Sequence, residues 1–348
     1  MADVSWAQMR RLAFSLLLFA FVPTARAEDV TYQNPKASGV ELAATFSRPP
    51  GETPIPAVLL LPGAGPQDRD ETTAGIKPLK TLSDYLNAHN IATLRADDRG
   101  VGASTGDFKS ATLQDFASDA QAGLAYLLQR RDVDPRRIGI IGHGQGAILA
   151  AIVAAEMPQQ VSFVVLLSGT AVTGEKVLLG QTARAEMAAG LPDEQVQADL
   201  RIGTVMYRMA MAGRPGAEMQ HVLAGAPEEW APFTVAWRKQ IPRLQSPWLK
   251  SFLSYDPSVA LEQLKCPVLA LFGEKDMTID PEQNAAAMKR AFSKGHNHEA
   301  KVKLLPGLNY LFQKAKTGMP NEYEALHESF DPSVLEEIQG WIAKVIQP

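Results

Sequence analysis

Short apolar runs alternate with longer stretches of helical periodicity along most of this chain. The runs fall at 57–61, 91–96, 138–141, 163–167, 268–272 and 302–305. A further run at 40–46 is more polar, which favours a strand near the edge of a sheet. Strands separated by helix-length segments are typical of βαβ units. The sequence therefore predicts an α/β fold with a mainly parallel sheet and crossover helices.

Helix signals fill several of the intervals between these runs. Residues 112–129 carry Thr112 and Asp115 in the spacing of a capping box, and apolar side chains repeat on one face behind them. Further helices are predicted at 146–155, 281–292 and 332–345. The last two begin with proline, which a helix tolerates best at its start.

One long segment, 174–258, interrupts the alternation because it contains no convincing buried strand. Its large apolar side chains include Met187, Met206, Met209, Met211, Met219, Trp230, Trp237 and Trp248. Methionine adapts to irregular apolar surfaces, so these residues suit either a pocket wall or the packing of helices on a core. The sequence therefore predicts an inserted helical lid at 174–258, between two parts of the core at 28–173 and 259–348.

Residues 1–27 have the features of a secretory signal peptide. Arg10 and Arg11 precede an apolar stretch at 12–22 that is short for a membrane span, and Ala25-Arg26-Ala27 fits a cleavage site. A membrane anchor that is never cut is the alternative. We expect an exported chain that begins at Glu28, lies in the periplasm or outside the cell, and has no stable membrane span.

Charge and cysteine content narrow the possible partners. The formal net charge is −4, and residues 1–27 contribute +2, so the rest of the chain carries −6. An acidic chain is a poor match for nucleic acid. Cys266 is the only cysteine and precedes an apolar run, so we expect a packed thiol rather than a reactive one. No Cys/His cluster has metal-ligand spacing, and no metal or other cofactor is expected.

A strand, a tight turn and the start of a helix are predicted in succession at 137–148. The turn reads Gly142-His143-Gly144-Gln145-Gly146. This is the context of the G-x-S-x-G turn that presents a serine nucleophile at the end of a strand, but here the central residue is Gly144. Such a turn strains the backbone of a residue with a side chain, whereas glycine adopts it freely. Gly144 therefore preserves the turn and removes the reactive atom.

Four further segments accompany this turn in a specific order. They are 65–70 (GPQDRD), 97–108 (DDRGVGASTGDF), 272–276 (FGEKD) and 304–313 (LLPGLNYLFQ). Together with the turn at 142–146, they resemble α/β-hydrolases of the serine-aminopeptidase-like and acyl-esterase-like group. The resemblance covers nearly the whole chain after the leader. It implies an α/β-hydrolase fold with an inserted lid, and it does not specify a substrate.

The resemblance also implies where a catalytic triad would lie. Asp276 stands at the family's position for the triad acid, with an ordinary turn aspartate as the alternative. Tyr310 stands where the family has its histidine base, and Gly144 stands where it has its serine nucleophile. Tyrosine titrates near pH 10 and is a poor base near neutral pH. Both reactive positions are therefore degenerate, while the acid is retained.

The expected oxyanion donors are backbone N–H groups of Ala64, Gly65 and Gln145. Gln145 replaces an acidic residue that is usual in the family. The helix that begins near Gln145 presents free N–H groups and the positive end of its dipole, which favour an anion. With the serine side chain absent, we expect room for a carboxylate oxygen at Gly144 and Gln145, and Tyr310 would donate to it from the opposite side.

Other residues offer weaker alternatives. The stretch 102–106 matches G-x-S-x-G literally, but it lies between a strand and a helix without joining them, so Ser104 is interpreted as part of a structural turn. His143 is expected to pack inward. His327 lies in an acidic, helical context and is expected to be solvated. His221, in the predicted lid, is the best of the remaining histidines, none of which has a paired motif.

Three functions remain open from the sequence. The first is an exported, hydrolase-derived protein without efficient Ser-His-Asp catalysis that binds a small acyl, ester or carboxylate ligand under the lid. The second is an active ester, thioester or amide hydrolase that uses an unrecognised nucleophile. The third is a structural or partner-binding protein with a vestigial pocket. A fold of this kind hosts many activities and does not choose between them.

Overall fold

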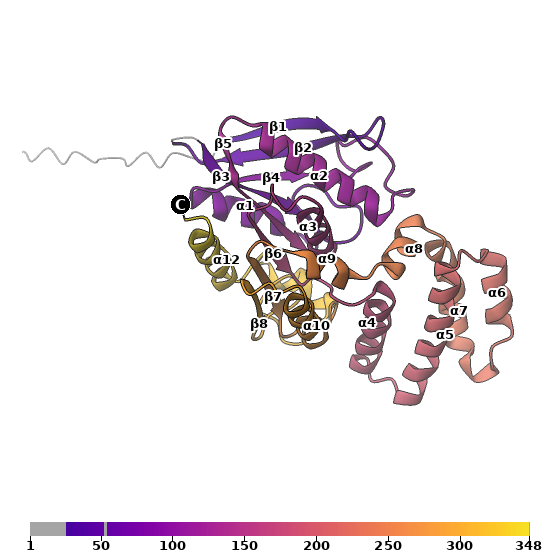
Figure 1. Cartoon of the computed structure of the whole chain (residues 1–348). Coiled ribbons are helices and arrows are strands. Elements are labelled where there is room, and N and C mark those ends of the chain that lie inside the picture. Colours follow the sequence, from indigo (N-terminus) through magenta and orange to yellow (C-terminus); the bar gives the residue numbers. More distant parts are fainter. Residues whose placement is uncertain (1–25, 52–53, 348) are drawn as a thin grey trace, which may run out of the picture.

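The computed structural model describes residues 26–51 and 54–347, so the predicted leader lies outside the described residues as far as residue 25. Eight strands form one sheet in the order β1-β2-β4-β3-β5-β6-β7-β8 (Figure 1). They are β1 (Arg26–Gln33), β2 (Glu41–Arg48), β3 (Ile55–Leu61), β4 (Ala92–Ala96), β5 (Val133–His143), β6 (Phe163–Leu167), β7 (Val268–Gly273) and β8 (Ala300–Leu305). The pairings of β2 with β1 and β4 are antiparallel, and the others are parallel. The predicted mainly parallel sheet is confirmed.

One edge of the sheet is a strand that the sequence does not predict. β1 pairs with β2 from Arg26 opposite Arg48 to Gln33 opposite Glu41. The predicted polar strand at 40–46 is β2, which is therefore second from the edge. β1 contains no apolar run, because its side chains are mostly exposed and polar. Arg26, which the sequence assigns to the leader, is the first residue of this strand.

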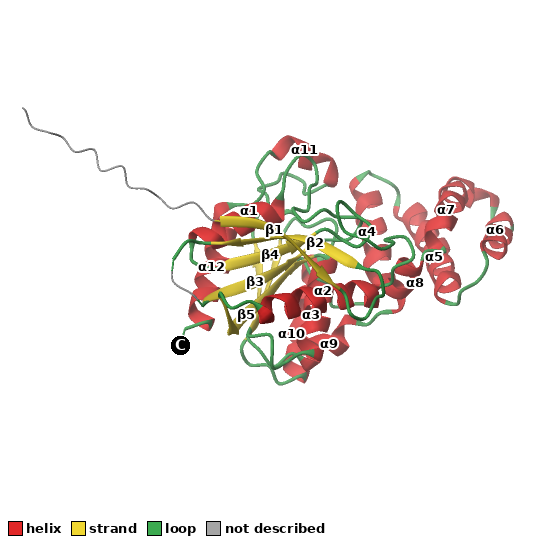
Figure 2. Cartoon of the chain, turned by 90° about the horizontal axis from the view of Figure 1, so that it is seen from above, coloured by secondary structure: helices red, strands yellow, loops and turns green. Residues whose placement is uncertain are grey.

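Helices cover both faces of the sheet (Figure 2). Two of them, α1 (Pro78–Ala88) and α12 (Pro332–Val345), pack on the face that receives Val58 and Leu60 of β3. Leu59 points to the opposite face, because successive strand side chains alternate. The helices on that face are α2 (Leu113–Gln129), α3 (Gln145–Glu156), α9 (Pro257–Gln263) and α10 (Pro281–Lys294).

The capping box predicted for α2 is confirmed, because Thr112 and Asp115 each accept a hydrogen bond from the other's backbone N–H. The prolines at 281 and 332 stand at the first positions of α10 and α12, as the sequence predicts. A 3-10 turn η2 (Pro320–Glu322) and the short α11 (Tyr323–Leu326) lie between β8 and α12.

Helices α4 to α8, which we call the helical insertion, lie between β6 and β7 in the chain and extend from the side of the sheet domain (Figure 1). They are α4 (Gly174–Ala188), α5 (Asp193–Met211), α6 (Gly216–Ala224), α7 (Ala231–Leu244) and α8 (Pro247–Ser254), with a 3-10 turn η1 (Glu228–Trp230) before α7. Met206 and Met219 are fully buried in apolar packing, whereas Met187 is exposed. That the insertion acts as a lid stays a prediction. In the part of the chain that the structure describes, no helix has both the length and the apolar character to span a membrane.

Candidate functional site

The predicted strand–turn–helix segment joins β5 to α3 through Gly144. This residue has φ 52° and ψ −109°, and its N–H donates to the carbonyl of Leu167 at 2.8 Å. A side chain at this conformation is strained by about 1–3 kcal/mol. The neighbouring Gly146 is required for another reason, because a Cβ there would meet the backbone of Leu61 at 2.6 Å or less. The turn therefore has the shape of a nucleophile elbow without a side chain at its centre.

The hydroxyl of Tyr310 fills the space above Gly144. A Cβ built on Gly144 would overlap Tyr310 Oη and lie 3.2 Å from the Cζ atom that carries it. A Cβ on Gly63 would come within 3.2 Å of the same oxygen, so Oη is held between these two glycines. The expectation of open room for a carboxylate above Gly144 is therefore wrong. The side chain expected to donate to such an anion occupies its place.

Burial raises the pKa of Tyr310 well above its ordinary value of 10.0, and the nearby charges of Glu71 and Asp276 raise it further. The phenol is consequently neutral near pH 7. It cannot act as an ionised nucleophile there, and it is a poor substitute for an imidazole base.

Asp276 lies just past the end of β7, with 2% of its surface exposed. Its Oδ1 accepts hydrogen bonds from the N–H groups of Thr278 and Ile279, each at 2.8 Å. Within the described residues, its Oδ2 has no hydrogen-bond partner, and no hydrogen bond joins it to the Tyr310 hydroxyl. Burial raises the pKa of Asp276 to about 6, although the two N–H groups, the Ser168 hydroxyl and the charge of His143 oppose this rise. The carboxyl thus has one oxygen without a well-formed hydrogen bond, and the Ser168 hydroxyl lies beside it.

A buried His143–Glu71 pair ties the elbow to its surroundings, and sequence reasoning missed its acidic member. The two side chains meet at 2.7 Å between Nδ1 and Oε1, and they are 2% and 4% exposed. Nε2 of His143 lies 3.0 Å from the carbonyl oxygen of Tyr310. A carboxylate and a carbonyl can only accept, so His143 donates from both nitrogens and is an imidazolium. Burial alone would lower its pKa, but the Glu71 carboxylate outweighs burial, and the pKa is raised from 6.5.

Glu71 also accepts from the N–H of Gly63 at 2.7 Å, so one carboxylate joins three segments of the site. It has φ 55°, which is uncommon for a residue with a side chain. The only sequence signal was its place directly after the motif at 65–70. The inward packing predicted for His143 is confirmed by its burial.

The expected oxyanion donors lie beside this cluster. Ala64 is exposed, and Gly65 has φ 106° in the turn that follows β3. Gln67 holds the turn, since its Nε2 donates to the carbonyl of Ala64 at 3.2 Å. Gln145 is the first residue of α3, and its side-chain Oε1 accepts from Nε1 of Trp248 in α8 at 2.7 Å. The helical insertion thus contacts the elbow directly, while the donor role of the three residues stays a prediction.

The alternative residues lie in structural or exposed positions. Ser104 is buried, donates to the carbonyl of Asp97 at 2.8 Å and accepts from the N–H of Ala43 at 2.9 Å, as expected of a turn residue. His221 and His327 are exposed. Burial raises the pKa of Cys266 to about 11, so its thiol is protonated near pH 7. Within the described ranges, no three His, Cys, Asp or Glu side chains form a group that would hold a metal.

Comparison with known proteins identifies the family. The model of the alpha/beta hydrolase family matches residues 58–310, and the chain belongs to this family. Esterase EstD from Thermotoga maritima is 24% identical over 297 residues, which are 85% of this chain and 64% of that protein. The chain therefore spans less than two thirds of this relative.

Solved structures share the fold at low identity. The alpha/beta hydrolase GrgF from Penicillium sp. sh18 has a TM-score of 0.57 at 15% identity, covering 92% of this chain and 99% of its own. Est1E from Butyrivibrio proteoclasticus, solved with ferulic acid bound, has a TM-score of 0.53 at 17% identity, covering 91% of this chain and 99% of its own. At such identities the likeness concerns the fold and not the activity.

Proposed function

We propose that this chain is a member of the α/β-hydrolase family that binds a small ligand without serine-hydrolase catalysis. The observation that carries the proposal is the position of Tyr310 Oη over Gly144, where the side chain of a nucleophile would lie. Removing the serine alone would leave an open elbow. A bulky, neutral phenol in its place also keeps the carbonyl of an ester away from the turn.

The ionisable groups nearest the elbow support this proposal because each has another role. His143 donates from both ring nitrogens to Glu71 and to a backbone carbonyl, so it has no free nitrogen to accept a proton. Asp276 accepts two backbone N–H groups and has no imidazole to orient. Acyl transfer on this fold needs a nucleophile with an adjacent base, and neither is present at the elbow.

The relative named as an esterase makes ester hydrolysis the activity to test. We expect the purified protein to show no saturable turnover of p-nitrophenyl acetate or butyrate near an ordinary enzyme rate of about 1 s⁻¹. A residual acceleration of about 10³–10⁴ over water is compatible, because binding and backbone donors alone supply that much. The matched variant Tyr310→Phe keeps the ring and removes the hydroxyl, and it should hydrolyse these esters at the same rate as the wild type. Saturable turnover at about 1 s⁻¹ or above would contradict the proposal, and its loss in Tyr310→Phe would identify the phenol as the acting group.

A further inference from the structure

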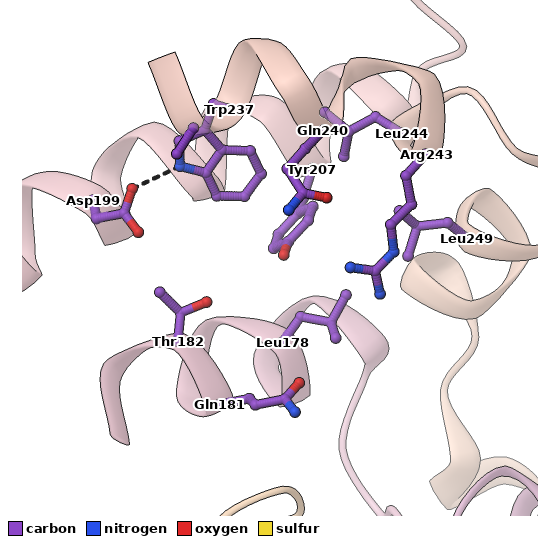
Figure 3. Close-up of a pocket in the computed structure, with 11 residues that line it drawn as sticks. Leu178, Gln181, Thr182, Asp199, Tyr207, Trp237, Gln240, Arg243, Leu244 and Leu249 are labelled. Atoms are coloured by element: carbon purple, nitrogen blue, oxygen red, sulfur yellow. Dashed lines mark hydrogen bonds between the residues drawn. The ribbon is translucent and has the colours of Figure 1, made fainter. Parts of the chain in front are cut away.

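A cavity of about 170 Å³ lies inside the helical insertion, between α4, α5, α7 and α8 (Figure 3). Its polar lining consists of Gln181, Thr182, Asp199, Tyr207, Gln240 and Arg243. An apolar cavity of about 150 Å³ is large enough to hold benzene, so this one admits a small organic molecule. It shares no lining residue with the cluster around Gly144 and Tyr310.

The carboxylate of Asp199, a buried residue, lines the cavity. Asp199, on α5, is 7% exposed, and its Oδ1 accepts from Nε1 of Trp237 at 2.6 Å. Its second oxygen is turned toward Thr182 (Figure 3). Burial, and then the charge of Asp199, raise the pKa of the adjacent Glu186 to about 7. Glu186 therefore keeps its proton up to about neutral pH and shares a hydrogen bond with Asp199, which is the carboxyl of the two that lines the cavity.

The guanidinium of Arg243, an exposed residue, faces the same cavity. Arg243 lies in the last turn of α7, and its guanidinium is directed toward the space beside the Tyr207 hydroxyl (Figure 3). Within the described residues, neither Arg243 nor Asp199 has an oppositely charged partner within 4.0 Å. Two opposite charges thus border one small cavity without pairing with each other. Arg243 is exposed and its charge is solvated, whereas Asp199 is buried, so a cationic group that reaches Asp199 would be favourable.

One part of the wall between these charges is apolar, although polar side chains make up the larger share of the lining. Tyr207 and Trp237 meet edge to face with ring centroids 5.2 Å apart, and Leu178, Leu244, Leu249 and Ala236 lie in the same lining. Such a surface favours an apolar group on the ligand. The Tyr207 hydroxyl adds a donor between the two charges, and both of them influence it. Burial raises its pKa to about 12, the charge of Arg243 lowers it, and that of Asp199 raises it.

We propose that this cavity binds a free α-amino acid with an apolar side chain. Its ammonium group lies at Asp199, its carboxylate at Arg243 and its side chain against the aromatic and leucine walls. A zwitterion offers one charged group to each of these side chains, whereas a simple acid or a simple amine leaves one of them unmatched. The inference rests on one part of the proposed function, namely that the protein binds a small ligand. It does not depend on the absence of catalysis at the elbow. A failure to bind amino acids would leave the prediction for ester turnover unaffected.

Titration calorimetry with L-leucine and L-phenylalanine tests the ligand class. We expect saturable binding of at least one of them below about 10 mM, where each tenfold change in affinity is 1.4 kcal/mol. Leucinamide lacks the carboxylate, and 4-methylpentanoate lacks the ammonium group. Each should bind at least about tenfold more weakly than leucine, because each lacks one of the two charge-assisted hydrogen bonds, which are stronger than neutral ones. No saturation by either amino acid, or equal binding of either analogue, would overturn the proposal.

Three variants test the position of the site. Arg243→Gln and Asp199→Asn should each weaken binding at least about tenfold. The asparagine retains an oxygen for Trp237, so the fold should tolerate it. Arg238→Gln is the matched control on the same helix, since Arg238 is exposed, lies outside the lining and donates to the carbonyl of Leu223 at 3.4 Å. If the first two variants bind like the wild type, or if Arg238→Gln weakens binding as much, the ligand lies elsewhere.

Discussion

The contact between Gly144 and Tyr310 predicts a strong energetic coupling in a double-mutant cycle. Replacing Gly144 by alanine adds a Cβ at φ 52° and ψ −109°, which is strained by about 1–3 kcal/mol. The same Cβ overlaps Tyr310 Oη, and overpacking of this kind adds about 1–3 kcal/mol. In the Tyr310→Phe background the overlapping oxygen is gone. The atom that carried it lies 3.2 Å from the added Cβ, so a shift of a few tenths of an ångström suffices.

Gly144→Ala should therefore lower the free energy of unfolding by about 2–6 kcal/mol in the wild type and by only about 1–3 kcal/mol in Tyr310→Phe. The coupling energy is the difference, about 1–3 kcal/mol. Urea unfolding followed by tryptophan fluorescence measures it, provided that the m-value is unchanged and that circular dichroism gives the same transition.

Gly39→Ala is the matched control, because Gly39 also has a positive φ, 76°, but no atom lies within 4 Å of its added Cβ. Its effect should be the same in both backgrounds to within about 0.5 kcal/mol. A coupling below about 0.5 kcal/mol for Gly144→Ala would refute the placement of Tyr310 over the elbow.

Three further outcomes are expected for the surroundings of the elbow. The pKa of Asp276 is about 6 in the folded protein against an ordinary 3.8, so its stabilising contribution is present below pH 3.8 and is lost as pH rises through 6. Between pH 4 and 8 the wild type should therefore lose at most about 3 kcal/mol of its free energy of unfolding from this group, and Asp276→Asn should remove that loss. An unchanged pH profile in the variant would contradict the burial of the Asp276 charge. Glu71→Gln should lower the free energy of unfolding by about 3–5 kcal/mol because it leaves the His143 imidazolium buried without its partner. Because the pKa of His143 is raised in the folded protein, this residue stabilises the fold fully below pH 6.5, and the contribution fades as pH rises through the folded-state pKa. Glu71→Gln should abolish this pH dependence of the free energy of unfolding. A variant that keeps the pH dependence would count against the ion pair. Trp248→Phe leaves the buried Oε1 of Gln145 without its donor and should lower stability by about 1–3 kcal/mol, whereas a change below about 0.3 kcal/mol in urea unfolding would show that this contact is not made.

The sequence predicts most of the fold because its strands and helices are marked locally. The apolar runs at 57–61 and 163–167 coincide with β3 and β6, and proline marks the starts of α10 and α12. The edge strand Arg26–Gln33 was missed because an exposed strand needs no apolar run. Its position comes from pairing with β2, which is a property of the folded chain.

The candidate site is less accessible from sequence, because its members meet only through the fold. Resemblance pointed to Gly144, Asp276 and Tyr310, but it gave no indication that the phenol would fill the place of the missing side chain. Glu71 was missed because its partner His143 is 72 residues away, and no local spacing marks such a pair. The position of Glu71 also depends on a left-handed backbone conformation, which the sequence around it does not require.

The most direct test of the account is covalent labelling of the elbow by a fluorophosphonate, measured as intact protein mass. Asp276 retains a free oxygen, and the turn retains its backbone, so Gly144→Ser combined with Tyr310→His should rebuild a nucleophile and a base. The account predicts a stoichiometric adduct on the introduced serine of the double variant. It predicts none on the wild type, and none on Gly144→Ser alone, where Tyr310 Oη overlaps the new side chain. An adduct on Gly144→Ser alone, or none on a folded double variant, would contradict it.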